Sequence, residues 1–158
     1  MRAWVARWLV LIGVVLAAAC GEQRSVQDWL QEAQQSHAHA DRAMEAGDAA
    51  EATRVLAAFF DTSAPDAINK DDARVVRQDI CYRLARIALG EEAPEDAAAW
   101  AERGLNQGRG EDVFTANLYV VRGQAKEALG NAIDAAADYH EALKINDQLL
   151  DGELSGEP

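Results

Sequence analysis

The sequence predicts an all-α protein built from three successive pairs of helices. Three observations support this fold class. Proline occurs only at positions 65, 94 and 158, so long uninterrupted segments separate the helix breakers. Apolar and polar residues do not alternate over a length that would form a strand. Glycines followed by helix-capping residues recur along the chain, and such pairs mark sharp turns between helices.

The first pair of helices is expected at residues 25–46 and 48–62. In the segment AGDAAEATRVLAAFF, Gly47 ends one helix and Asp48 begins the next. Glu51 follows three residues after Asp48 and completes a capping box, which gives partners to free backbone N–H groups in the first turn of a helix. These residues predict a helical hairpin with a very short turn.

The second pair is expected at residues 71–89 and 94–106. Gly90 is placed to end the first of these helices, and Pro94 is placed to start the second. Proline is well tolerated at the first position of a helix, because its missing N–H would have no partner there. The segment ALGEEAPEDAAAW therefore predicts a second, looser turn.

The third pair is expected at residues 112–129 and 131–148, with the turn at Gly130 and Asn131. An ordinary amphipathic helix needs bulky apolar residues on one face. This segment instead keeps small residues around Tyr139, which indicates two helices that cross so closely that only glycine or alanine fits. The small residues are Gly123, Gly130, Ala135 and Ala142.

Residues 115–148 resemble the tetratricopeptide repeat (TPR), a 34-residue helix pair with small residues at the helix crossing. The residues that carry the resemblance are Tyr119, Gly123, Gly130, Ala135, Tyr139 and Ala142. Residues 33–66 match more weakly, and the middle pair fits only after a two-residue insertion. The resemblance implies a short right-handed solenoid of about three helix pairs. The glycines at the turns lie 43 and 40 residues apart, so a HEAT-like array, with a period of about 40–47, is an alternative.

Residues 1–19 have the three parts of a secretory signal peptide. Arg2 and Arg7 lie in a positively charged start, the apolar run WLVLIGVVLAAA follows, and small residues end it. The run is shorter than the roughly 20 residues that a membrane-spanning helix requires. We therefore expect these residues to direct export and to be removed.

The segment LAAAC, which ends at Cys20, resembles the lipobox of bacterial lipoproteins. The resemblance implies that the Cys20 sulfur carries a diacylglyceryl group and that Cys20 becomes the acylated N-terminus, with residues 20–24 as a tether. Gly21 in place of aspartate implies sorting to the outer membrane, on its periplasmic side. Ala17 and Ala19 also fit an ordinary signal cleavage site, which leaves a soluble periplasmic or secreted protein as the alternative.

The remaining cysteine and the charge limit the possible partners. Cys81 lies among apolar residues at helical spacing, which predicts a small buried hydrophobic residue. Without Arg2 and Arg7, Lys and Arg fall from 15 to 13 against 27 acidic residues, and the net charge changes from −12 to −14. Such a surface repels nucleic acid and the anionic headgroups of lipids, so membrane attachment must come from the lipid anchor.

The sequence contains no pattern of catalytic residues, and we expect neither an enzyme nor a cofactor. No glycine-rich phosphate loop, nucleophile elbow or HExxH motif occurs. His37 and His39 lie two residues apart and point about 200° away from each other on a helix. His37 and Asp41 are one turn apart, but two ligands without a third make a weak metal site. A metal or small-ligand site at His37 and Asp41 is therefore only an alternative.

The TPR resemblance implies a partner-binding groove lined by the first helix of each pair. Its expected residues are Gln34, His37, Asp41 and Met44 from the first pair, and Asn117, Val120, Gln124 and Glu127 from the third. Arg77 is the expected contribution of the middle pair, with Arg83 or Arg86 in its place if the register differs. Polar groups of this kind bind a peptide backbone or carboxylate. The alternative is that these residues are simply solvated helix faces.

The repeat domain is expected at residues 25–150, followed by a flexible acidic tail at 151–158. Leu149 and Leu150 lie on a final helix face that no further capping helix covers, which makes them a possible interface. The sequence therefore favours an adaptor that binds another envelope protein at the outer membrane. The alternatives are a structural lipoprotein that associates with itself and a protein that binds a small ligand or metal.

Overall fold

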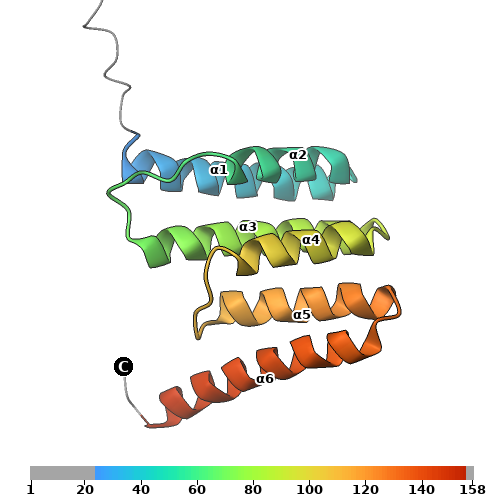
Figure 1. Ribbon diagram of the computed structural model, residues 1–158. Helices are drawn as coiled ribbons and strands as arrows, with labels where there is room; N and C mark the ends of the chain where they lie inside the picture. The colour runs from blue at the N-terminus through green and yellow to red at the C-terminus, as the bar shows by residue number, and fades with distance from the viewer. Residues whose placement is uncertain (1–23, 156–158) are drawn as a thin grey trace, which may run out of the picture.

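The computed structural model describes residues 24–155, where the chain forms six α-helices and no strand (Figure 1). The all-α class is thereby confirmed. No helix within this range is long and apolar enough to span a membrane. The expected signal peptide and Cys20 lie outside the described residues. The helices are α1 (Val26–Glu45), α2 (Ala49–Phe60), α3 (Lys70–Gly90), α4 (Pro94–Leu105), α5 (Val113–Ala128) and α6 (Ala132–Ser155).

The helices pack as three hairpins, α1 with α2, α3 with α4, and α5 with α6. Figure 1 shows them as successive layers, with α1 and α2 at one end and α6 at the other. The second hairpin contacts the first through α2 and α3, and contacts the third through both α3 and α4, which pack on α5. Each hairpin therefore buries its apolar face against the next one.

Two of the three turns lie at the predicted glycines. Asp48 caps α2 as predicted, but the capping box is not completed, because the Glu51 carboxylate pairs with Arg54 and His39 and the Asp48 N–H donates to the Ala43 carbonyl oxygen. Asp48 Oδ1 accepts a hydrogen bond from the Glu51 N–H at 2.9 Å. Gly47 and Gly130 have φ angles of +78° and +79°, a backbone region that glycine enters without strain. The middle turn differs from the prediction, since α3 includes Gly90 and the positive φ, 57°, belongs to Glu92. Three residues, 91–93, separate Gly90 from Pro94, so the turn lies after the glycine and not at it.

The last helix is longer than the sequence predicted. It was expected to end at residue 148, but α6 continues to Ser155. Five of the eight residues expected in a flexible tail at 151–158 are therefore helical. Gly152 lies inside the helix, where glycine costs only about 1 kcal/mol relative to alanine, and no proline lies between Ala132 and Ser155.

Glycines allow very close contacts between helices in the core. A Cβ atom added to Gly123 on α5 would lie 2.5 Å from Tyr139 Cε1 on α6, which confirms the close crossing that the sequence predicted. A Cβ atom on Gly104 of α4 would lie 2.9 Å from Cys81 Cβ on α3. Cys81 is a buried free thiol, as predicted, and burial raises its pKa to about 12.

A buried carboxylate joins α5 and α6. The Asp138 side chain on α6 is 5% exposed and accepts hydrogen bonds from Arg122 Nε and Nη2 at 2.9 and 2.6 Å. Lys126 Nζ lies 2.8 Å from Asp138 Oδ2, and Arg122 also pairs with Glu102 on α4. These charges satisfy each other across three helices, so the cluster has a structural role.

Candidate functional site

Two neighbouring cavities form a groove between α1 and α3, which we call the α1–α3 groove. The first, about 290 Å³, has mostly apolar walls. The second, about 270 Å³, has more charged walls, and Asp79 lines both. The first is lined by Leu30, Ala33, Gln34, His37, Val75, Val76, Asp79 and Phe114. The second is lined by Ala40, Asp41, Met44, Leu56, Asp79, Tyr82, Arg83, Arg86 and Ile87.

Charged side chains link the two walls of the groove at its centre. On α3, Asp79 Oδ2 lies 3.5 Å from Nε2 of His37 on α1 and 3.4 Å from Arg83 Nε. Arg83 Nη1 donates a hydrogen bond to Asp41 Oδ1 on α1 at 2.8 Å. These contacts hold α1 and α3 side by side and separate the two cavities.

His37 carries a polar atom that has no partner. Burial lowers the pKa of His37, and Arg83 lowers it further, which outweighs the opposite effects of Asp79 and Asp41. The imidazole is therefore neutral at neutral pH and carries one proton. We assign that proton to Nε2, which faces the Asp79 carboxylate, so Nδ1 is an acceptor. Nδ1 is buried and has no hydrogen-bond partner, a state that a bound donor would relieve.

The groove brings together the residues predicted on α1. Gln34 and His37 line the first cavity, and Asp41 and Met44 line the second. The residues predicted on α5 share a face with Phe114, because they follow it at helical spacing. Of these, Val120 packs against the core, Asn117 is half-buried, and Gln124 and Glu127 are exposed.

Arg77 lies elsewhere, and Arg83 and Arg86 contribute to the groove in its place. Arg77 Nη2 donates a hydrogen bond to the Thr62 carbonyl oxygen at 2.9 Å, and its guanidinium lies over the Phe60 ring. It therefore fixes the connection between α2 and α3. The α3 wall follows the spacing 75, 79, 82 and 86, and Arg77 is about 200° from Asp79 around the helix.

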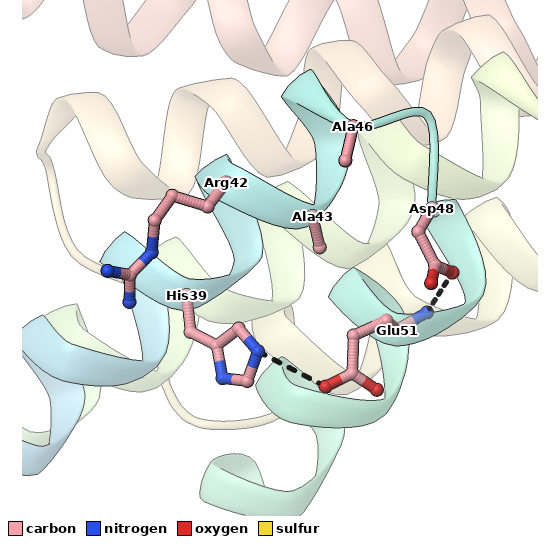
Figure 2. A pocket seen from close by; sticks show the side chains of 6 residues that line it. All are labelled: His39, Arg42, Ala43, Ala46, Asp48 and Glu51. Atoms are coloured by element: carbon pink, nitrogen blue, oxygen red, sulfur yellow. Dashed lines mark hydrogen bonds and ion pairs between the residues drawn. The ribbon is translucent and has the colours of Figure 1, made fainter.

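A separate hollow of about 350 Å³ lies where α1 turns into α2 (Figure 2). His39 Nε2 lies 3.2 Å from Glu51 Oε1, and Glu51 also accepts hydrogen bonds from Arg54. Asp48 caps α2 through the Glu51 N–H. His39, Asp48 and Glu51 already have partners that stabilise the turn, so this hollow is a weaker candidate site than the α1–α3 groove.

The two histidines of the H-x-H pair face different helices. His37 contacts Asp79 on α3, whereas His39 contacts Glu51 on α2. This arrangement agrees with the roughly 200° separation expected for residues two apart on a helix. Across residues 24–155, no group of three His, Cys, Asp or Glu side chains is arranged to hold a metal ion.

No family model, curated protein or solved structure matches the chain. The α1–α3 groove therefore has to be interpreted from its own chemistry. Sequence reasoning missed several residues of its walls, among them Val75, Asp79 and Phe114. The adjacent valines at 75 and 76 could have indicated this wall. Two neighbouring residues of a helix point about 100° apart, so one of the two valines falls outside the stripe that faces the core.

Proposed function

We propose that the chain is a lipid-anchored adaptor on the periplasmic side of the outer membrane, which holds a segment of another envelope protein in the α1–α3 groove. The observation that carries this proposal is the unpartnered Nδ1 of His37 beside a cavity with apolar walls. Binding sites in proteins commonly combine apolar walls with a few fixed polar groups. The groove offers both.

We also propose that the three hairpins form a short right-handed solenoid of the TPR type. The support is the close approach of Gly123 to Tyr139, together with the buried Ala135 and Ala142. These residues occupy the positions that carry the resemblance in the sequence. In such an array the first helices of successive hairpins form one surface, which would place the face of α5 with Asn117 and Gln124 in continuation of the groove.

The groove defines the chemistry of the segment it would hold. The first cavity accepts an apolar side chain against Leu30, Val75 and Phe114. A backbone N–H or hydroxyl of the partner would donate to His37 Nδ1 after a rotation of the ring that brings this buried atom to the cavity. In the second cavity, Arg86 contacts the ring and the hydroxyl of Tyr82, and its charge would bind a carboxylate. The expected ligand is an extended or helical segment with one apolar and one acidic side chain.

A photocrosslinking amino acid at Gln34 tests the groove in cells that express the full chain. We expect one discrete protein adduct from Gln34, because this residue is exposed and lines the first cavity. Val75→Glu should reduce the adduct by about tenfold, since it places a charge against the apolar wall. The matched control Val113→Glu changes a valine that is 49% exposed and should leave the adduct intact. Mass spectrometry identifies the adduct.

Two results would contradict groove binding. One is an adduct that persists in Val75→Glu while circular dichroism shows both variants folded. The other is the same adduct from a crosslinker at Arg54, an exposed residue of α2. Either result would place the contact outside the groove.

The lipid anchor is tested separately at Cys20. We expect the full chain to incorporate labelled palmitate in cells and to sediment with outer membranes, and Cys20→Ala to abolish both. The acyl chains supply the apolar area that binds the bilayer, about 0.8 kcal/mol per buried CH₂. Cys81→Ala is the control, because its thiol is buried. A mature protein without acyl mass would show secretion by the ordinary route.

A further inference from the structure

The outer side of α6 carries a stripe of exposed residues that repeats every three or four positions. Ile133 and Leu154 are both 85% exposed, and Leu143 and Leu150 are 61% and 60% exposed. The helix packs on α5 through a different face, which includes the buried Ala135, Ala142 and Ile145. The full stripe is Ile133, Ala136, His140, Leu143, Asp147, Leu150 and Leu154.

The spacing of the stripe is that of a helix that pairs with another helix. Its members alternate between steps of three and four residues over three heptads, which keeps them on one face at the 3.5-residue repeat of coiled coils. Since α6 is the last helix of the stack, no other described helix covers this face (Figure 1). Large apolar side chains exposed in such a row mark an interaction surface.

Four of the seven stripe residues pair with one another when the stripe is turned end to end, and the other three each fall one position from a stripe residue. His140 and Asp147 lie at equal distances on either side of the bond between Leu143 and Lys144, and so do Ile133 and Leu154. An antiparallel pair with a two-fold axis at this bond therefore brings His140 of each copy opposite Asp147 of the other. Closed two-fold interfaces use the same patch on both copies in this way.

We propose that a second copy of this chain packs antiparallel on α6, with Leu143 at the centre and two His140–Asp147 contacts beside it. A lipid surface fits the stripe less well, because helices that lie on membranes carry Lys and Arg on their polar face. α6 instead carries the exposed acids Asp134, Asp151 and Glu153 with one lysine, Lys144. The proposal concerns a surface separate from the α1–α3 groove, and each can fail without the other.

Pairs of single cysteines in the full chain test the direction of packing in cells. Chains with Ile133→Cys and Leu154→Cys, each with its own tag, are expressed together and treated with a short bismaleimide. We expect adducts between the two tags, and also between two copies of Leu143→Cys. Two Ile133→Cys chains should not crosslink, since an antiparallel pair separates these positions by about 30 Å at 1.5 Å per residue. The parent chain reports any background from Cys20, and Cys81 is buried.

The charges test the register. With Leu143→Cys as reporter, His140→Asp should reduce the adduct about tenfold, because it places carboxylates opposite each other. Adding Asp147→His to the same chain should restore it. Gln148→Asp introduces the same charge at an exposed position outside the stripe and should have no effect.

Three outcomes would overturn the proposal. Adducts between two Ile133→Cys chains would show parallel packing. Failure of Asp147→His to restore the adduct would show that the two side chains do not meet. Adducts from Leu143→Cys only to other proteins, or to none, would assign the stripe to a different protein or to lipid.

Discussion

Replacing Asp138 by alanine is expected to lower the free energy of unfolding by about 2 kcal/mol, because Arg122 and Lys126 lose their shared buried carboxylate and Arg122 keeps only Glu102. Urea unfolding followed by circular dichroism measures the loss. Asp151→Ala is the matched control, since Asp151 is an exposed acid of the same helix, and it should change stability by less than about 0.5 kcal/mol. Equal effects of the two substitutions would show that the cluster contributes little.

The same cluster predicts how stability depends on pH. Burial by itself raises the pKa of Asp138, but the hydrogen bonds and charges of Arg122 and Lys126 outweigh it, and the pKa lies below its ordinary value. A carboxyl group with a lower pKa in the folded state stabilises the fold above its unfolded pKa, about 4. This stabilisation is lost as the pH falls through the folded pKa. Asp138→Ala should therefore make unfolding less sensitive to acid below about pH 4.

Replacing Trp29 by alanine is expected to cost about 3–5 kcal/mol, the usual range for truncating a large buried aromatic side chain. Trp29 is 0% exposed, its ring lies 5.2 Å from that of Phe59, and its Nε1 donates to Thr62 Oγ1 at 3.3 Å. The cavity would open between α1 and α2. Urea unfolding gives the size of the loss.

Trp100→Ala provides the comparison, because Trp100 is only half-buried and packs edge-on against Phe60. Its loss should be clearly smaller than that of Trp29→Ala. Equal losses would mean that burial does not determine the contribution of these two rings.

The helix boundaries at the first and third turns could be predicted from the sequence because local chemistry determines them. Asp48 caps α2 by accepting from the N–H three residues later, and Gly47 and Gly130 take the backbone angles that few other residues accept. The close contact of Gly123 with Tyr139 could also be predicted, since small residues at helical spacing around an aromatic residue indicate a close helix crossing. Such features need no knowledge of distant parts of the chain.

The α1–α3 groove and the Asp138 cluster could be predicted only in part. Which face of α3 meets α1 depends on how the first and second hairpins are positioned relative to each other. No local sequence pattern indicates that position. The sequence therefore predicts Arg77 in the groove, whereas Asp79 and Arg83 are the residues that reach α1. Asp138 looks like any surface acid in the segment AAADYHEAL, and its burial depends on Arg122 from another helix.

The order of packing has a consequence for how the chain folds. Helices that pack extensively on each other are at most two apart in the sequence of helices, and α3 with α5 is the most distant such pair among residues 24–155. Proteins with mainly local contacts fold fast, because short loops close at a small cost in chain entropy. Any of the three hairpins can thus serve as a nucleus on which its neighbour is added, and the individual stabilities of the hairpins decide which one folds first.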